Sequence, residues 1–585
     1  MKVNARVFTL VLSAVLIIGL AACGGSNQAG NTGTDSSQAQ TQQQAQSDAN
    51  EEAPEASGSD SGQDHQEITF YLWGEKPNQM DDVMNHFNET GGKELNMTWK
   101  TNWTPLDDYA NSIKLRLSAG EPVDACFDAQ WLMMLDFIRE GNYRDMGPYF
   151  QNPKYPGLLN SFDANYLDAN QLGTGSNYGV PFAQAFGVAP LVFIRGDLRE
   201  QYGIPPVKSL ADYEVFLEAI RDNEPNMFPV TTSVERNTST ITNHENSLYT
   251  DVEAPKAGVW YDLYIASGVH ANAYVKDYQL VDVALSIEPA GAYAAFPAPF
   301  NQRNIGMDYK LGILARDHFE RGFLDPDFLT VSSMAGIFTS GKAASMIWDT
   351  ANYLTIVNTT KLALPDATIE VYQPDPVYRE GTLGQKKGIF NAWNFICVPV
   401  TTPEPKFDRI MQFFNWMFSS WENHDLIELG ISGKHFEPVG ENQFKIPDGV
   451  DPATNYNLPG YQLTWNPNFI RLSADMPDDV VLYNQRANNP DTYFDQLFSG
   501  FAFDPTGVET ALANPDMATA IDRASNIRYG IIPNVVEAFA ALDADMESNR
   551  NLMSDIESIK EELRKQIQEF LNERKVKDES RGVKW

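Results

Sequence analysis

The sequence predicts an α/β protein with at least two lobes and a long helical C-terminal region. Short runs of β-branched and aromatic residues alternate with amphipathic stretches of about ten residues, which is typical of βαβ units. The chain is 585 residues long and 12% aromatic, so it can bury a core that is too large for one domain. Residues 535–575 carry apolar side chains at helical spacing.

The first part of the folded body alternates strands with helices. The helix expected after the first strand has Met80, Val83, Met84 and Phe87 on one face, and Gly91-Gly92 ends it. This order indicates a mainly parallel sheet. The expected strands are 68–73, 95–101 and 122–127, and the expected helices are 79–89, 106–119 and 131–140.

The same alternation continues along the chain. We expect strands at 188–195 and 389–400 and a strongly apolar helix at 406–421. Ser209 is a candidate N-cap for a helix that runs to about Asn223. The C-terminal helix should pack on a lobe, although a short coiled coil with a partner is the alternative. Its apolar stripe consists of Ile556, Ile559, Leu563, Ile567 and Phe570.

The first 22 residues have the parts of a secretory signal peptide. Lys2 and Arg6 precede an uncharged apolar run that is shorter than the roughly 20 residues a spanning helix needs. The run ends in Leu-Ala-Ala-Cys, which resembles the bacterial lipobox and implies cleavage before Cys23 and acylation of that cysteine. An ordinary signal peptide with an incidental cysteine is the alternative. Acyl chains on Cys23 would hold the protein at a membrane surface.

Residues 23–66 should form a flexible tether. From Gly24 the stretch contains no aromatic residue and no branched aliphatic one, so it cannot bury enough apolar surface to fold. The whole chain has a formal net charge of −35, which argues against nucleic acid or anionic lipid as a partner of the body.

Four stretches of the body carry recognisable motifs. The longest has a G-x-P turn, an extended crossing, an R-x-D-L step and a G-I-P-P turn before a helix. Together they resemble the extracellular solute-binding proteins (family 1) of ABC importers, which bind sugars and oligosaccharides. The long tail resembles the LplA-like lipoproteins of Gram-positive bacteria. The four stretches are Phe70–Pro77, Val123–Trp131, Tyr178–Ile220 and Phe338–Leu354.

This resemblance implies a two-lobed, periplasmic-binding-protein-like (type II) fold with crossing hinge strands. Lobe 1 would comprise residues 67–185 and 388–432, and lobe 2 residues 186–387 and 433–585, including the helical extension. The ligand would lie between the lobes and be trapped by rotation about the crossings near 183–188 and 389–393. We expect a monomer at the outer face of a Gram-positive cell membrane, held by lipid on Cys23, that delivers a carbohydrate to ABC permease subunits.

Aromatic and polar residues follow the expected strands. A sugar site needs aromatic faces together with carboxylates and amides that bind hydroxyl groups. A single Trp at a strand end is more often part of a core, but several such clusters at ends that face one cleft favour a ligand site. Trp465, Asn466 and Arg471 in the tail could complete it. The expected ligand-binding residues are Trp73, Glu75, Asp128, Trp131, Trp348, Asp349, Asn352, Trp393 and Asn394.

Catalytic and cofactor motifs are incomplete. Residues 336–342 fit G-x-x-x-x-G-K, but Ala343 stands where a P-loop needs Ser or Thr. His244-Glu245 lacks the second histidine of H-E-x-x-H. We therefore expect no enzyme, no cofactor and no metal site. An exported glycan hydrolase and a binder of a non-sugar solute such as a peptide remain alternatives, because sequence does not show the distance between two carboxylates.

Two cysteines remain in the body. Cys126 and Cys397 are too few for a disulfide scaffold, and they are either buried free thiols or one disulfide.

Overall fold

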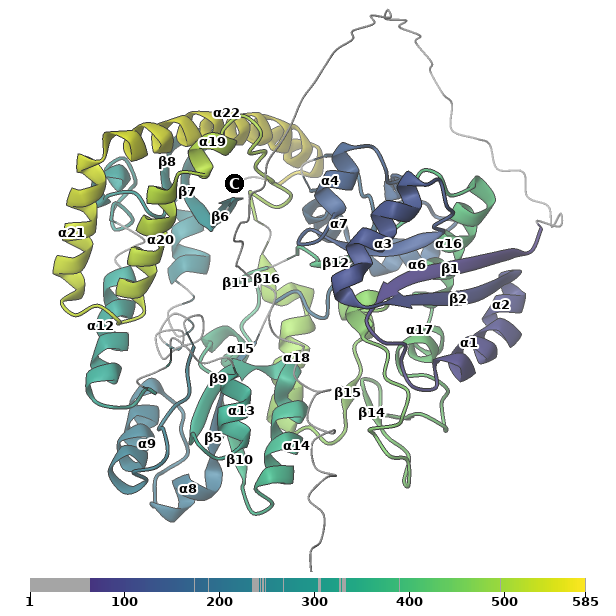
Figure 1. Cartoon of the computed structure of the whole chain (residues 1–585), viewed down its shortest axis with the longest axis horizontal. Helices are drawn as coiled ribbons and strands as arrows, with labels where there is room; N and C mark the ends of the chain where they lie inside the picture. Colours follow the sequence, from purple (N-terminus) through teal and green to yellow (C-terminus); the bar gives the residue numbers. More distant parts are fainter. Residues whose placement is uncertain are drawn as a thin grey trace, which may run out of the picture. The chain divides into compact units, whose positions relative to one another are not determined.

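The structure is a computed structural model (Figure 1) that describes residues 64–583 apart from positions 173, 188, 234–240, 242–243, 245–246, 248, 267, 303–306, 326–327, 329–332, 389 and 495. The predicted signal peptide, Cys23 and nearly all of the predicted tether lie outside the described residues. Within the described part, no helix combines the length and apolar character that crossing a bilayer requires.

Lobe 1 is built on a five-stranded sheet of order β2-β1-β3-β12-β4. Strand β1 pairs in parallel with β2 and β3, as the βαβ pattern predicted. Strand β12 is antiparallel to β3 and β4, because it returns from the other lobe. The strands are β1 (Gln66–Trp73), β2 (Met97–Thr104), β3 (Ala125–Ala129), β4 (Val180–Phe182) and β12 (Asn394–Cys397).

Helices on this sheet bury a largely aromatic core. Phe87 packs edge-on against Trp99 and Trp416, with ring centroids 5.7 and 5.1 Å apart, and Phe70 lies 5.3 Å from Phe413. Such edge-to-face pairs are the geometry that aromatic rings prefer. The helices of lobe 1 are α1 (Met80–Glu89), α2 (Gly91–Glu94), α3 (Leu106–Ser118), α4 (Met134–Arg139), α5 (Gly147–Phe150), α6 (Pro156–Ser161), α7 (Ala164–Ala169), α16 (Glu404–Met417) and α17 (Trp421–Glu428).

Lobe 2 contains a three-stranded sheet of order β10-β5-β9. Both pairings are antiparallel, so the expectation of a mainly parallel sheet is wrong here. Strand β5 starts at the edge of the sheet where β9 and β10 end, so both neighbours run opposite to it. The strands are β5 (Pro190–Arg195), β9 (Ser345–Asp349) and β10 (Ile369–Tyr372), and the neighbouring helices are α8 (Gly196–Gln201), α9 (Leu210–Asn223), α13 (Met334–Thr339), α14 (Tyr353–Ala363) and α15 (Pro376–Glu380).

A second sheet of lobe 2 packs against the C-terminal helices. Strands β6, β7 and β8 form an antiparallel meander whose inner face shares one apolar cluster with the stripe of α22. The predicted C-terminal helix is therefore present, but it is divided into α21 and α22 at Asn549. The elements are β6 (Val259–Ala266), β7 (Val269–Lys276), β8 (Gln279–Leu285), η1 (Tyr249–Glu253), α11 (Ala254–Lys256), α12 (Met307–Glu320), α19 (Glu509–Leu512), α20 (Pro515–Arg528), α21 (Val535–Ser548) and α22 (Arg550–Arg581).

The segment between α17 and α18 lies on lobe 1. Tyr456, Leu458 and Leu463 belong to the same core cluster as the five-stranded sheet, whereas the sequence-based division placed residues after 432 in lobe 2. Lys434 also pairs with Asp82 of α1 at 2.6 Å. The remaining elements are β11 (Lys386–Lys387), β13 (Glu437–Val439), β14 (Gln443–Lys445), β15 (Leu472–Ser473), α18 (Asp478–Asn488), β16 (Tyr493–Phe494) and the short helices η2 (Ala290–Tyr293), η5 (Thr350–Asn352), η6 (Gly460–Gln462), η7 (Pro467–Phe469) and η8 (Pro490–Thr492).

Local signals located most elements to within a few residues. The Ser209 side chain accepts a hydrogen bond from the backbone N–H of Asp212, which confirms the predicted N-cap of α9. The apolar helix expected at 406–421 is α16, which ends at Met417, and a second helix, α17, begins at Trp421. Ser420, in extended conformation, caps the second of them by accepting from the N–H of Asn423.

Candidate functional site

One edge of the five-stranded sheet gathers the strand ends of lobe 1. Trp73 at the end of β1 is in register with Thr104 at the end of β2. Asn394 at the start of β12 is in register with Ala129 of β3 and Phe182 of β4. All five strands therefore present chain ends at this edge, where open α/β sheets place ligands.

Aromatic rings lie along this edge. The rings of Trp73 and Trp131 both pack against Phe127, with centroids 6.2 and 6.1 Å from that ring. Trp131 is 38% exposed and Trp393 is 67% exposed, and both were predicted as site residues. An exposed Trp at a strand end offers an apolar face to a solute.

Asp128 is close to the edge but enclosed. Its carboxylate accepts hydrogen bonds from the Tyr143 hydroxyl at 2.6 Å and from the backbone N–H groups of Ala129 and Met133 at 2.7 and 3.0 Å. Burial raises the pKa of Asp128 to about 6. Its contribution to the site is to hold the loop that carries Trp131, because its side chain is fully buried and does not reach a solute.

The other two polar residues predicted for the site in lobe 1, Glu75 and Asn394, reach the surface. Glu75 is exposed beyond Gly74, whose φ of 98° turns the chain at the end of β1. Asn394 is half-buried at the start of β12.

The C-terminal extension, residues 433–585, contacts Trp73 through Tyr461. The sequence did not indicate this contact. The ring of Tyr461 lies 5.6 Å from that of Trp73, and Trp465 lies 5.7 Å from Tyr461. Of the tail residues considered, Trp465 is at this edge. Asn466 instead binds the Ser161 carbonyl oxygen, and Arg471 pairs with Asp425.

The predicted residues of lobe 2 cluster at the end of β9. Asn352 donates a hydrogen bond from Nδ2 to Asp349 Oδ1 at 2.8 Å. Trp348 is half-buried, and Asp349 is in register with Pro190 at the start of β5.

The two edges are joined by one short crossing. Strand β4 ends at Phe182 on the first edge, and β5 begins at Pro190 on the second. An extended chain covers at most about 3.5 Å per residue, so these two residues are no more than about 28 Å apart. The aromatic edge of lobe 1 and the Trp348 cluster of lobe 2 (Trp348, Asp349 and Asn352) therefore adjoin the same crossing, as a hinged site requires.

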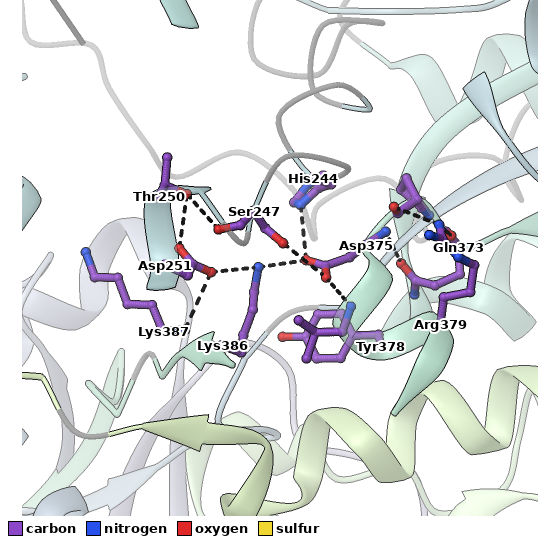
Figure 2. Close-up of polar contacts among 12 residues, drawn as sticks. His244, Ser247, Thr250, Asp251, Gln373, Asp375, Tyr378, Arg379, Lys386 and Lys387 are labelled. Carbon is purple, nitrogen blue, oxygen red and sulfur yellow. Dashed lines mark hydrogen bonds and ion pairs between the residues drawn. The ribbon is translucent and has the colours of Figure 1, made fainter. Parts of the chain in front are cut away.

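A buried ion cluster holds the return crossing (Figure 2). Lys386 Nζ lies 2.6 Å from Asp375 and 3.1 Å from Asp251, and Ser247 donates to Asp375 at 3.3 Å. Burial would lower the pKa of Lys386, but the two carboxylates outweigh it and the pKa is raised. Because Lys386 precedes the predicted hinge at 389–393, this cluster fixes the lobe 2 end of that crossing.

A cavity of about 520 Å³ lies beside this cluster, between β6, β7 and the strand β16. It is within the size range of small-ligand pockets. None of the nine predicted ligand residues, all of them described, lines it. Its lining includes Asp251, Lys256, Trp260, Val275, Tyr278 and Phe494.

The remaining motifs have structural roles. Residues 336–342 form the end of α13 and the turn before β9, where Gly341 has a φ of 78°, so they do not join a strand to a helix as a P-loop does. No group of three potential metal-ligating side chains occurs among the residues that the structure describes. Cys126 and Cys397 are in register on β3 and β12, and both are buried free thiols.

Comparisons with known proteins find likeness in structure. No protein-family model matches the chain, and no curated protein sequence matches it. The N-glycan transport solute-binding protein NgtS of Streptococcus pneumoniae has a TM-score of 0.62 at 17% identity, over 86% of this chain and 99% of that one. A solute-binding protein of Bifidobacterium longum infantis, described as binding human milk oligosaccharides (HMO) and associated with an ABC transporter, has a TM-score of 0.54 at 13% identity, over 87% and 99%. The chain therefore has the two-lobed fold of extracellular solute-binding proteins.

Proposed function

We propose that this chain is an extracellular solute-binding protein of an ABC importer and that it captures a carbohydrate, in particular an oligosaccharide. The observation that carries the proposal is the fold likeness over nearly the whole length of NgtS, a protein described as transporting N-glycans. A structure of NgtS in complex with Man1GlcNAc gives a TM-score of 0.55.

The chemistry of the two edges supports a sugar as the solute. Trp131 and Trp393 offer exposed ring faces in lobe 1, and the half-buried Asn352, held by the buried Asp349, offers an amide in lobe 2. Sugar rings have apolar faces and a rim of hydroxyl groups, so they need both kinds of partner.

Capture would proceed by hinge closure. The crossings at 183–189 and 388–393 are the hinge candidates, and Asn170 holds the second by binding the Phe390 carbonyl oxygen and the Ala392 N–H at 2.8 and 2.7 Å. Rotation about these segments would bring the Trp348 cluster toward the aromatic edge and exclude water from the solute.

Delivery would take place at a membrane. The lipobox-like sequence before Cys23 supports a lipoprotein on the outer face of a Gram-positive cell, with residues 24–66 as its tether, and the long tail supports the LplA-like subgroup. A lipid on Cys23 would keep the binding protein near the permease subunits that accept its solute. Mass spectrometry of the protein purified from native membranes tests for the lipid.

A calorimetric and thermal-shift screen of the folded body tests the function. The probes are N-glycans, human milk oligosaccharides and, as controls, peptides. Trp131→Ala should weaken glycan binding roughly tenfold, since loss of an aromatic face costs about 1 to 2 kcal/mol. Tyr264→Ala is the matched control, because Tyr264 is a 61% exposed aromatic on β6, away from both edges. Release of smaller sugars would support a hydrolase instead, and stabilisation by peptides alone would refute the carbohydrate assignment.

A further inference from the structure

The turn Gly460–Trp465 of the C-terminal extension is rigidly anchored on lobe 1. Leu463 and Thr464 are fully buried, and Gln462 is 1% exposed. The carbonyl oxygen of Gly460 accepts the N–H groups of Thr464 and Trp465, each at 2.9 Å. His424 of α17 donates from Nε2 to the carbonyl oxygen of Thr464 at 3.0 Å.

Gln462 fastens this turn to the end of β1. Its Oε1 accepts the backbone N–H of Trp73 at 3.2 Å, and its Nε2 donates to the Trp73 carbonyl oxygen at 2.8 Å. The amide thus pairs with Trp73 as a neighbouring strand would, so the turn and the strand end keep a fixed relation.

Two aromatic rings of the turn remain at the surface. Tyr461 and Trp465 are half-buried, although the three residues between them are buried. A Cβ atom on Gly460 would collide with the indole of Trp465, so glycine at this position lets the ring fold back over the turn. Packing alone does not require an anchored turn to leave both its rings partly exposed beside Trp73.

The rings continue a row that begins at Trp131. Successive centroids from Trp131 through Phe127, Trp73 and Tyr461 to Trp465 are 5.6 to 6.2 Å apart. Phe127 is fully buried, but the other four rings are at least partly exposed. A pyranose ring covers about one such ring, so together the four offer more surface than a monosaccharide covers.

We propose that the C-terminal extension forms part of the carbohydrate-binding surface and that Tyr461 and Trp465 bind the distal rings of an oligosaccharide. The inference rests on the proposed function and adds a preference for longer chains. Trp131 and Trp73 would bind the proximal unit, and the extension would add affinity only when a further sugar ring reaches it.

The test measures binding of Man1GlcNAc and Man5GlcNAc, and of short and long human milk oligosaccharides, to the wild type and to Tyr461→Ala and Trp465→Ala. Each variant should lose about tenfold in affinity for the longer glycan of the pair that binds and less than twofold for the shorter one. Trp131→Ala should weaken the binding of both glycans. Tyr461→Phe, which keeps the ring, should bind like the wild type, and hydrogen exchange of residues 460–465 should slow when the longer glycan is bound.

The outcomes separate the two proposals. If Trp131→Ala weakens binding while Tyr461→Ala and Trp465→Ala bind both glycans as the wild type does, the role of the extension is refuted and the proposed function stands. If the wild type binds none of these glycans, the proposed function itself fails. Circular dichroism and thermal unfolding identify a variant that has lost its fold. In that case Tyr461→Phe is the deciding variant: if it loses as much affinity for the longer glycan as Tyr461→Ala was expected to lose, although it keeps the ring, a role for the ring is contradicted.

Discussion

Glu428 shows how one buried side chain makes stability depend on pH. Its Oε2 atom lies 3.3 Å from Nε2 of His424 inside lobe 1. Burial and, to a smaller extent, the charge of Asp425 raise the pKa of Glu428 to about 7. The folded chain therefore binds this proton more tightly than the unfolded chain, in which a glutamate titrates near its ordinary value.

The sign of the resulting prediction follows from this shift. The stabilisation from protonated Glu428 is complete below the ordinary glutamate pKa and is lost as the pH rises through 7. Glu428→Gln stays neutral, so its free energy of unfolding should exceed that of the wild type by about 2 kcal/mol at pH 8, with the difference shrinking toward pH 5. Urea unfolding at pH 5, 7 and 8 measures it. Glu422→Gln, an exposed change on the same helix, should show no such trend, and a pH-independent difference for Glu428→Gln would contradict the argument.

At the scale of an element, α22 combines an apolar stripe with buried ion pairs, of which Lys560–Glu288 links it to another part of lobe 2. Leu552, Ile556, Ile559, Leu563, Ile567 and Leu571 are all at most 2% exposed. Asn549 caps the N-terminus by accepting from the N–H of Leu552, and Gly582, with a φ of 72°, ends the helix. Within this stripe Lys560 Nζ lies 2.8 Å from Oε1 of Glu288, and both side chains are more than nine-tenths buried.

Removing one partner of this pair should cost more than removing both. Lys560→Met leaves the Glu288 carboxylate buried without its cation, so we expect a loss of about 3 to 5 kcal/mol in unfolding free energy. In the double variant Glu288→Gln/Lys560→Met most of this loss should be recovered, because a neutral amide still accepts the N–H of Leu285 that Glu288 binds at 2.6 Å. Denaturant unfolding of both variants and of Glu288→Gln gives the coupling energy. A double variant as unstable as Lys560→Met would contradict this explanation.

At the scale of the whole molecule, the end of α22 adds an ionic contact between the two lobes to the backbone crossings. Lys577 and Arg581 lie 2.5 and 2.7 Å from the two carboxylate oxygens of Asp168, at the end of α7 in lobe 1. Asp168 is 6% exposed, so the pairs are less screened than surface ion pairs. The lobes are thus joined by this ionic contact as well as by backbone crossings, which include the passage from β15 on lobe 1 to α18 on lobe 2.

Releasing this connection should widen the range of lobe orientations. Asp168→Asn is expected to lower the unfolding free energy by about 1 to 3 kcal/mol and to broaden the distance distribution from small-angle scattering without solute. Glu573→Gln, at an exposed site on the same helix, is the control. Unchanged scattering for Asp168→Asn would show that this ionic contact does not constrain the lobe arrangement.

The sequence predicted those elements whose signals are local. The stripe of Met80, Val83, Met84 and Phe87 defined α1, and Ser209 marked the start of α9, because spacing and capping depend only on near neighbours. The antiparallel direction of β9 and β10 was missed, since strand direction depends on which edge a returning chain reaches. The strand expected at 389–400 is shorter: β12 pairs with β3 over Asn394–Cys397 and with β4 over 394–396.

The candidate site was predictable only as residue types at strand ends. Trp131 and Trp393 lie exposed at the edge, whereas the equally plausible Asp128 is buried under it, and only packing separates the two cases. Tyr461 and Gln462 carried no signal, because their partner Trp73 is nearly 390 positions away in the chain. Asp251, Asp375 and Lys386 likewise form a cluster only after folding.

The buried state of Cys126 and Cys397 has a practical consequence for following motion in this molecule. Burial and the neighbouring Asp128 raise the pKa of both thiols, so neither forms the reactive thiolate readily at neutral pH. In a form that starts after Cys23, a cysteine introduced at an exposed position of each lobe would carry a fluorophore or spin label without competition from these two. Cys126 and Cys397 can therefore stay in place when labels on the two lobes are used to measure how long a captured solute is held.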